Sequence, residues 1–312
     1  MQKILVVAPN WIGDALMAQP LLARLKRSGA QIDMLAPEWV APVLRRMPEV
    51  TRVINTPFRH GALQLGQRWR LARELGREGY ERALVLPNSW KSALIPFFAG
   101  IPEREGYLGE VRYGLLNRIH HSKKAPMPLH YAELAGGPAP AQGLKVASVE
   151  IDQARRRFGL GGPYVVLCPG AEYGPAKRWP YFKQLAEKLK APVVLLGSRN
   201  DREAAAGLPG INLVGQTSLD EAIALIAGAQ AVVSNDSGLM HVAAALGRPQ
   251  VALFGSSSPE HTPPASPRSR VLWLHLECSP CFERVCPLGH FRCMKEIRVE
   301  QVTAALDSLS SP

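Results

Sequence analysis

Short apolar runs alternate along the chain with stretches in which apolar residues recur every three or four positions. The short runs, bounded by Pro, Gly, Asn or Asp, predict buried strands at 4–8, 32–35, 53–55, 83–86, 164–168, 193–196, 212–214, 231–234 and 250–254. The helical spacing predicts helices at 15–26, 63–78, 181–190, 219–227, 239–246 and 299–309. Strands that alternate with helices in this way are typical of an α/β protein with parallel sheets covered by helices on both faces.

The alternation is interrupted once, by a stretch at 123–144 that is rich in Pro, Gly and Ala and predicts a loop. At 312 residues the chain is longer than most single domains. We therefore expect two doubly wound, Rossmann-like domains, 1–155 and 156–312, that face each other across a cleft lined by the loops after the strands. The last helix is a candidate to pack back on the first domain.

The most informative stretch is AVVSNDSGLMHVAAALGRPQVALFGSSS, at 231–258. It predicts a strand, a tight polar turn at 235–238, a helix and a second strand. Unpaired backbone N–H groups and the positive end of the helix dipole meet at such a turn, so Asp236, Ser237 and Gly238 mark an anion site. His241, in the first helical turn, can reach the same place. The pattern favours a phosphorylated small molecule as ligand.

Three other loops that follow predicted strands carry candidate chemistry. Asp14 is either an ordinary helix cap or a general base at a cleft, and Gly13 beside it lets a substrate approach the backbone. In GAEYGPAKRWP, Lys177 can neutralise a diphosphate or belong to a solvated Lys-Arg pair. Asp201, in GSRND, either binds a sugar hydroxyl or caps a helix, and the cap is favoured. Neither a P-loop nor a strand-linked G-x-G-x-x-G is present.

The net charge of +11 is concentrated in the first 150 residues. A basic surface attracts nucleic acid, anionic lipid or phosphorylated substrates, or is simply solvated. No zinc-finger spacing or RNA-binding aromatic signature favours nucleic acid. The chain has neither an apolar run of about 18 residues nor a signal peptide, so we expect a cytoplasmic protein. The basic residues singled out are Arg68, Arg70, Arg73, Arg77, Lys91, Arg104, Arg112, Arg118, Lys123 and Lys124.

Four of the five cysteines, Cys278, Cys281, Cys286 and Cys293, form a C-x2-C-x4-C-x6-C cluster with His290 between the last two. Disulfides are rare in cytoplasmic proteins, so the cluster is either a metal site or a set of reduced structural thiols. Its spacing fits no standard zinc pattern, and a confident metal site is not predicted.

Several segments, in order along nearly the whole chain, resemble the ADP-heptose:lipopolysaccharide heptosyltransferases of glycosyltransferase family 9. The NSWKSALIPFFAGIP block and the cysteine tail resemble the heptosyltransferase II subfamily in particular. The other segments are NWIGDALMAQPLLARL, PGAEYGPAKRWP and GQTSLDEAIALIAGAQAVVSNDSGLMHVAAALGRPQVALFGSSSPEHTPP. The resemblance implies a GT-B fold and an inverting transfer of L-glycero-D-manno-heptose from ADP-heptose to heptosyl-Kdo2-lipid A in the lipopolysaccharide inner core.

By the same resemblance Asp14 is the catalytic base, and Lys177, Asp236, Ser237, Gly238 and His241 bind the donor. Glu172 and Tyr173 occupy the place of a Thr-Thr pair that contacts the donor phosphate in the enzymes adding the first heptose. That departure puts the hydroxyl contacts of this pair in doubt. Lys177 and the helix N-terminus would offset the charge of the leaving ADP. No D-x-D clamp is present, so we expect no metal or other cofactor to be required.

The acceptor implied by the resemblance is a phosphorylated, Kdo-bearing lipid A, with Ser89, Trp90 and Lys91 on the acceptor side. Trp90, Phe97 and Phe98 either contact the inner membrane face or pack in the core. Three alternatives remain at this point. They are heptosyltransferase I or III with another acceptor, a UDP-sugar 2-epimerase of the same fold, and a non-catalytic basic module that binds membrane or nucleic acid.

Overall fold

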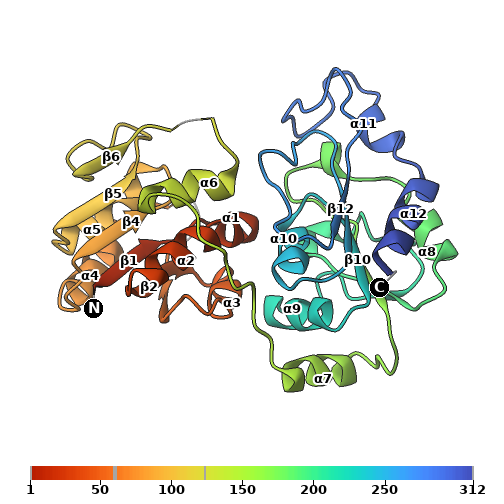
Figure 1. The fold of residues 1–312 in the computed structure, drawn as a ribbon, viewed down its shortest axis with the longest axis horizontal. Coiled ribbons are helices and arrows are strands. Elements are labelled where there is room, and N and C mark those ends of the chain that lie inside the picture. Colours follow the sequence, from red (N-terminus) through yellow and green to blue (C-terminus); the bar gives the residue numbers. More distant parts are fainter. Residues whose placement is uncertain (1, 59–61, 123, 311–312) are drawn as a thin grey trace. The chain divides into compact units, whose positions relative to one another are not determined.

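The computed structural model describes residues 2–58, 62–122 and 124–310, so Lys123 of the basic set lies outside the described residues. The chain divides into two compact units, Met1–Leu144 and Lys145–Pro312 (Figure 1). The boundary that we expected after residue 155 would fall inside helix α7 (Ser148–Arg157). That helix packs on α9 (Leu219–Ala227) and belongs to the second unit.

The N-terminal unit contains a six-stranded parallel sheet with the strand order β3-β2-β1-β4-β5-β6. Its helices α4 and α5 cover one face, where Ala72, Leu75 and Ile95 pack on alternate residues of β1 and β4. The strands are β1 (Lys3–Val7), β2 (Gln31–Pro37), β3 (Arg52–Thr56), β4 (Arg82–Val85), β5 (Glu103–Tyr107) and β6 (Arg118–His120). The helices are α1 (Ile12–Met17), α2 (Gln19–Arg27), α3 (Ala41–Leu44), α4 (Leu65–Leu75), α5 (Leu94–Phe98) and α6 (Met127–Ala132).

The C-terminal unit repeats this topology in a second parallel sheet, in the order β12-β11-β10-β7-β8-β9. Numbered within each unit, both sheets have the order 3-2-1-4-5-6 of dinucleotide-binding folds, which confirms the predicted fold class. The strands are β7 (Val165–Cys168), β8 (Val193–Leu195), β9 (Ile211–Asn212), β10 (Ala231–Asn235), β11 (Gln250–Leu253) and β12 (Ser269–Leu272). The helices besides α7 and α9 are α8 (Phe182–Lys188), α10 (Gly238–Ala245), α11 (Arg292–Lys295) and α12 (Val299–Ser310).

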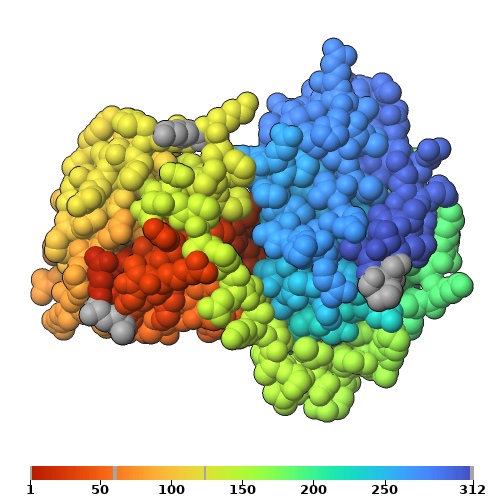
Figure 2. Space-filling view, in the orientation of Figure 1, coloured from red at the N-terminus to blue at the C-terminus, as the bar shows by residue number. Residues whose placement is uncertain are grey.

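Helices cover both faces of the C-terminal sheet (Figure 1). Val165 and Leu167 point to the face covered by α8 and α12, and they share a core with Val302 and Leu306 of the last helix. The apolar stripe of α12 is therefore buried on the sheet of its own unit. Figure 2 shows that the blue part of the chain, which includes the segment after β12, covers much of the visible surface of this unit.

Three strands and several short helices were not predicted. β5 has the sequence EREGY and so lacks the apolar run that marks a buried strand. Its Glu105 instead forms an ion pair with Arg82 of the neighbouring strand β4. The single helix expected at 15–26 is two helices, separated at Ala18, because Pro20 can begin a helix but not continue one. The loop expected at 123–144 contains α6, which packs on α2.

Among the residues described, none of the helices combines the length and the apolar character that crossing a membrane requires.

Candidate active site

The strand order of each sheet reverses between two central strands, β1 and β4 in one unit and β7 and β10 in the other. Ligands of open α/β sheets bind at this switch point, beyond the carboxyl ends of the strands. In the C-terminal unit the loop after β7 (169–179) and the turn after β10 (235–238) both begin there. The two loops with the predicted anion chemistry are thus brought together by the topology.

Lys177 and Asp236 form an ion pair at this point. The Nζ atom of Lys177 lies 2.5 Å from Oδ2 of Asp236, and the two side chains are 15% and 6% exposed. Lys177 ends a short 3-10 turn, Pro175–Lys177, and its ammonium lies 4.8 Å from the centre of the Tyr173 ring. The pair places a cation where an anionic ligand would meet the start of α10.

Asn235 binds the two loops to each other, and the sequence analysis did not single it out. Its Oδ1 accepts a hydrogen bond from the backbone N–H of Trp179 at 3.1 Å. Its Nδ2 donates to the carbonyls of Pro169 and Gly170 at 2.8 and 3.2 Å. Because Asn235 is completely buried, these bonds fix the lysine-bearing loop against β10.

Ser257 is a second residue that sequence reasoning missed. Its hydroxyl donates to Oδ2 of Asp236 at 2.6 Å, so this carboxylate oxygen accepts from both Ser257 and Lys177. Ser257 follows β11, the neighbour of β10, in the triplet Ser256-Ser257-Ser258. Three serines directly after a buried strand were a signal that could have identified it.

α10 begins one residue earlier than predicted, at Gly238, with Ser237 in the extended conformation at the N-cap and no side chain capping the helix. The Ser237 hydroxyl instead lies 3.1 Å from that of Ser234. The first N–H groups of the helix, those of Gly238, Leu239 and Met240, therefore lack a side-chain cap, whereas the N–H of His241 already donates to the carbonyl of Ser237. His241 is 6% exposed, and burial lowers the pKa of its imidazole to about 4 although the nearby Asp236 carboxylate raises it. His241 is thus a neutral group at neutral pH.

Asp201 acts as a cap in the structure. Its Oδ2 accepts hydrogen bonds from the backbone N–H and the hydroxyl of Ser198, both at 2.8 Å. Its other oxygen, Oδ1, is buried without a hydrogen-bond partner, packed against Gly170. Glu172 accepts from the side chain of Asn200 on the surface, and the Tyr173 hydroxyl donates to the carbonyl of Phe282.

Asp14 is the third residue of α1, and Trp11 occupies the N-cap position. The carboxylate is therefore inside the first turn instead of capping it, with Gly13 one residue earlier. A negative charge in the first turn is stabilised by the helix dipole. Burial raises the pKa of the Tyr131 phenol well above its usual value, and the negative charge of Asp14 raises it further.

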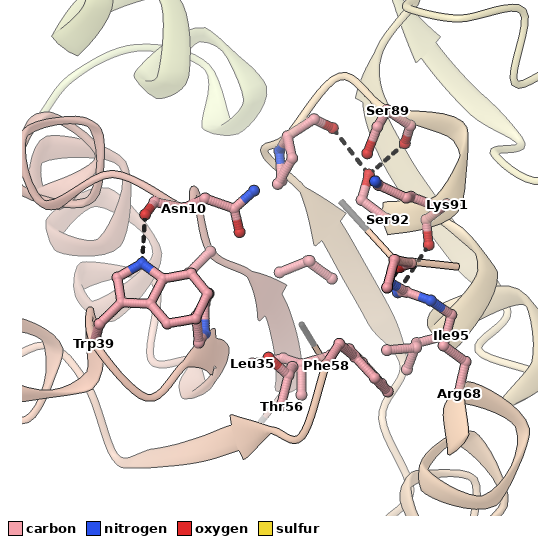
Figure 3. A pocket seen from close by; sticks show the side chains of 15 residues that line it. Asn10, Leu35, Trp39, Thr56, Phe58, Arg68, Ser89, Lys91, Ser92 and Ile95 are labelled. Atoms are coloured by element: carbon pink, nitrogen blue, oxygen red, sulfur yellow. Dashed lines mark hydrogen bonds between the residues drawn. The ribbon is translucent and has the colours of Figure 1, made fainter. Parts of the chain in front are cut away.

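The N-terminal unit has a pocket that is open to solvent at its own switch point (Figure 3). Of the three residues predicted on the acceptor side, Ser89 and Lys91 line this pocket and Trp90 does not. Arg68 also lines it, yet its guanidinium donates to three backbone carbonyls and serves to hold the pocket wall. The remaining lining is mostly apolar and aromatic: Val7, Ala8, Asn10, Leu35, Pro37, Trp39, Thr56, Phe58, Ala62, Pro87, Ser92 and Ile95.

Two of the basic residues counted toward a basic surface are internal. Arg112 is completely buried and donates to the carbonyls of Tyr107 and Pro87, and burial lowers the pKa of its guanidinium to about 10. Arg68 is 6% exposed. The basic surface is therefore smaller than the sequence suggests. Of the aromatic residues, Trp90 and Phe97 are exposed at 40% and 41%, and Phe98 is half-buried.

The four clustered cysteines are free thiols, with Cys293 buried and the other three partly exposed. Within the described part of the chain, no three His, Cys, Asp or Glu side chains are arranged to hold a metal ion. The metal interpretation of the cluster is therefore not supported by the structure.

The chain is similar to a known enzyme family and to several of its members. Residues 68–292 match the family model "Glycosyltransferase family 9 (heptosyltransferase)". The chain is 43% identical to lipopolysaccharide heptosyltransferase 2 of Escherichia coli K12 over 98% of both proteins. It is 28% identical to lipopolysaccharide heptosyltransferase 1 of Pseudomonas aeruginosa over 96% of this chain and 92% of that protein.

A solved structure, the ADP-heptose lipopolysaccharide heptosyltransferase II of E. coli, superposes with a TM-score of 0.87 at 41% identity, covering 99% of this chain and 98% of that one. The sequence and the fold agree with those of these relatives over nearly the full length, and the family model matches residues 68–292. The chain belongs to glycosyltransferase family 9, the heptosyltransferases.

Proposed function

We propose that this enzyme transfers L-glycero-D-manno-heptose from ADP-heptose to heptosyl-Kdo2-lipid A, with inversion at the anomeric carbon, in assembly of the lipopolysaccharide inner core. The observation that carries the proposal is the Lys177–Asp236 pair at the switch point of a chain that is 43% identical to a heptosyltransferase 2. The greater identity to heptosyltransferase 2 than to heptosyltransferase 1 favours the heptosylated acceptor.

The donor diphosphate binds between Lys177 and the start of α10 in this proposal. Lys177 supplies a positive charge, and the uncapped N–H groups from Gly238 onward supply hydrogen-bond donors. Asp236 and Ser257 hold the ammonium in place before the donor arrives, so little reorganisation is needed as charge develops on the leaving ADP. His241 is buried and neutral at neutral pH, so it adds no positive charge to that of Lys177.

Asp14 acts as the general base. A sugar hydroxyl is far too weak an acid to ionise at neutral pH, so its proton must leave as the new glycosidic bond forms. The Asp14 carboxylate accepts that proton, and the anomeric carbon passes from the ADP oxygen to the acceptor oxygen. Tyr131 beside it remains a neutral phenol because burial opposes its ionisation. We expect the transfer to need no metal, because Lys177 and the N–H groups at the start of α10 offset part of the charge of the diphosphate.

The pocket of the N-terminal unit receives the acceptor. Its aromatic wall, with Trp39 and Phe58, suits the apolar face of a sugar ring, and Lys91 suits a phosphate or carboxylate of the inner core. In this assignment, the predicted acceptor residues Ser89 and Lys91 lie in the wall of the acceptor pocket. It leaves Trp90 outside the acceptor site.

We also infer peripheral contact with the anionic inner membrane, because the acceptor is anchored in lipid. The α4–α5 face carries the exposed apolar side chains Leu65, Trp69 and Phe97. Trp69 packs edge-on against Phe98 at 5.2 Å, and Arg104 lies over Phe97. Exposed arginines from the same helix and its end flank these rings: Arg70, Arg73 and Arg77. Apolar rings flanked by cations match an anionic headgroup layer.

The activity is tested by incubating the purified enzyme with ADP-heptose and either heptosyl-Kdo2-lipid A or Kdo2-lipid A, with mass analysis of the products. Addition of one heptose to the heptosylated acceptor alone supports the proposal. Addition to Kdo2-lipid A alone would assign the enzyme to the first heptose transfer instead. Absence of product on both acceptors would overturn the proposal and return the epimerase and binding-module alternatives.

A further inference from the structure

The segment that carries the cysteines has no role in the proposed chemistry, yet it contacts the donor site directly. It runs from 276 to 291, between β12 and α11, without helix or strand. We call it the cysteine segment. Its middle residues, Phe282 to Arg284, make backbone hydrogen bonds to two different loops of the C-terminal unit.

The first contact is with the loop that carries Lys177. The carbonyl of Arg284 accepts a hydrogen bond from the N–H of Ala176, the residue before the lysine, at 3.0 Å. The Tyr173 hydroxyl donates to the carbonyl of Phe282. The two backbones are so close at Gly174 that a Cβ there would lie 2.5 Å from the Arg284 oxygen. Gly174 also has φ of +147°, a conformation that other residues rarely adopt.

The second contact is with the loop that carries Ser257. The N–H of Phe282 donates to the carbonyl of Ser256 at 2.7 Å. The hydroxyl of Ser279 donates to the carbonyl of Gly255 at 2.5 Å. Ser256 immediately precedes Ser257, whose hydroxyl binds Asp236. The cysteine segment therefore touches the residue before each of the two groups that bind Asp236.

We propose that the backbone of Phe282 to Arg284 is a positioning element of the donor site, which fixes the loops of Lys177 and Ser257 relative to Asp236. A shift of the segment would move both loops together, because Phe282 binds one loop through its carbonyl and the other through its N–H. Electrostatic stabilisation depends on the placement of a charge to within fractions of an ångström. Donor affinity and the rate of ADP departure therefore depend on residues that do not touch the donor.

Two of the four clustered cysteines lie next to the positioning backbone. Cys281 immediately precedes Phe282, and Cys286 follows Arg284 by two residues. The Sγ atom of Cys286 lies among backbone N–H groups, first that of Phe291, and these lower the pKa of its thiol. Cys281 and Cys286 therefore lie within two residues of the two ends of the positioning backbone.

The test compares Gly174→Ala with a matched control, Gly159→Ala. Both glycines have positive φ, but a Cβ at Gly159 meets nothing within 4 Å, whereas at Gly174 it meets the Arg284 carbonyl. Gly159→Ala shows the effect of alanine at a positive-φ position with free space around it, and the strain at Gly174 is separated from displacement of the segment by a variant that leaves the backbone conformation unchanged. Tyr173→Phe is a milder second variant that removes only the hydroxyl bound to Phe282 and leaves the ring beneath Lys177.

The readouts are the dissociation constant of ADP by titration calorimetry, the KM values of donor and acceptor, and the thermal midpoint. We expect Gly174→Ala to weaken ADP binding and raise the donor KM about tenfold or more, Tyr173→Phe to weaken both about threefold, and the acceptor KM to stay within twofold. Gly159→Ala keeps wild-type donor binding. Folded Gly174→Ala and Tyr173→Phe proteins that bind ADP like wild type would overturn the positioning role.

The inference rests on the proposed donor site, and the calorimetry separates the two. A wild-type protein that binds no ADP would overturn the donor assignment itself, and the positioning role with it. A wild-type protein that binds ADP, with variants that bind it equally well, overturns only the positioning role.

Discussion

Lys177 and Asp236 are 59 positions apart in the sequence, yet their charged atoms lie 2.5 Å apart at the switch point of the C-terminal sheet. The contact arises because β7 and β10 are neighbours and parallel, so the loops that follow them begin at the same edge. The order of the strands therefore fixes the position of the Lys177 ammonium.

Replacement of Lys177 by Met removes this charge and leaves the buried Asp236 carboxylate with the Ser257 hydroxyl. We expect kcat/KM for the donor to fall about a hundredfold or more, since one lost electrostatic donor has an effect of that order. The free energy of unfolding falls by about 3 kcal/mol, because one charge of a buried pair is left uncompensated. Steady-state kinetics and urea unfolding measure the two effects.

Lys188→Ala is the control for that variant, since Lys188 pairs with Glu300 on the surface, where both side chains are largely exposed. It is expected to change neither activity nor stability measurably. Equal losses in the two variants would contradict the assigned role of Lys177.

His241 makes stability depend on pH. Burial lowers the pKa of its imidazole from 6.5 to about 4, so between these values the unfolded chain binds a proton that the folded chain does not. The stabilisation is present above pH 6.5 and is lost as pH falls toward 4, by about 3 kcal/mol. His241→Gln should lose this part of the pH dependence in urea unfolding, whereas His261→Gln, on the surface, should keep it. Identical pH profiles for wild type and His241→Gln would refute the assignment.

Lys91→Ala tests the pocket of the N-terminal unit. Loss of this cation should raise the KM for the lipid acceptor about tenfold at low ionic strength and less at high salt, because salt screens the attraction to anionic groups. The KM for ADP-heptose should not change. Lys124→Ala, which removes an exposed charge away from the pocket lining, is the control. An unchanged acceptor KM in Lys91→Ala would remove this residue from the acceptor site.

The α4–α5 face is tested by flotation with lipid vesicles. Wild type should float with vesicles that contain an anionic phospholipid, and salt should weaken the association. The double variant Trp69→Ala and Phe97→Ala should float less, whereas Tyr113→Ala, an exposed aromatic on another loop, should behave as wild type. Salt-insensitive association, or equal flotation of all three proteins, would argue against membrane contact through this face.

Metal independence is a further expectation. Asp236 already accepts from Lys177 and Ser257, and the lysine supplies the cation that a divalent ion would otherwise provide at a diphosphate. Heptose transfer, followed directly by mass analysis of the product, should proceed at the same rate with excess EDTA. Loss of activity in EDTA that Mg²⁺ restores would contradict the mechanism.

The sequence predicted elements with strong local signals well. α9 has the predicted bounds because its apolar face is preceded by a capping box, Ser218 with Glu221. β5 was missed because its polar side chains pair across strands, and α7 was missed because only Ala154 on it is buried. A local pattern carries no information about which partners an element will find.

The same limit applies to the site. Asp236 and Lys177 could be singled out because each stands in a loop directly after an apolar strand. Asn235 and Ser257 act only through partners far away in the sequence, Trp179 and Asp236, and their roles depend on which strands are neighbours. Arg112 illustrates the opposite error, since a charge counted for the surface proved to be an internal donor to backbone carbonyls.

The most direct test of the account is the rate of heptose transfer from ADP-heptose to heptosyl-Kdo2-lipid A by wild type and by Asp14→Asn, with ADP affinity measured on both. The account predicts that kcat falls by several hundredfold or more in the variant, since the amide cannot accept the acceptor proton, while ADP binds with unchanged affinity. A variant that retains at least a tenth of the wild-type kcat would contradict the role of Asp14 as the base.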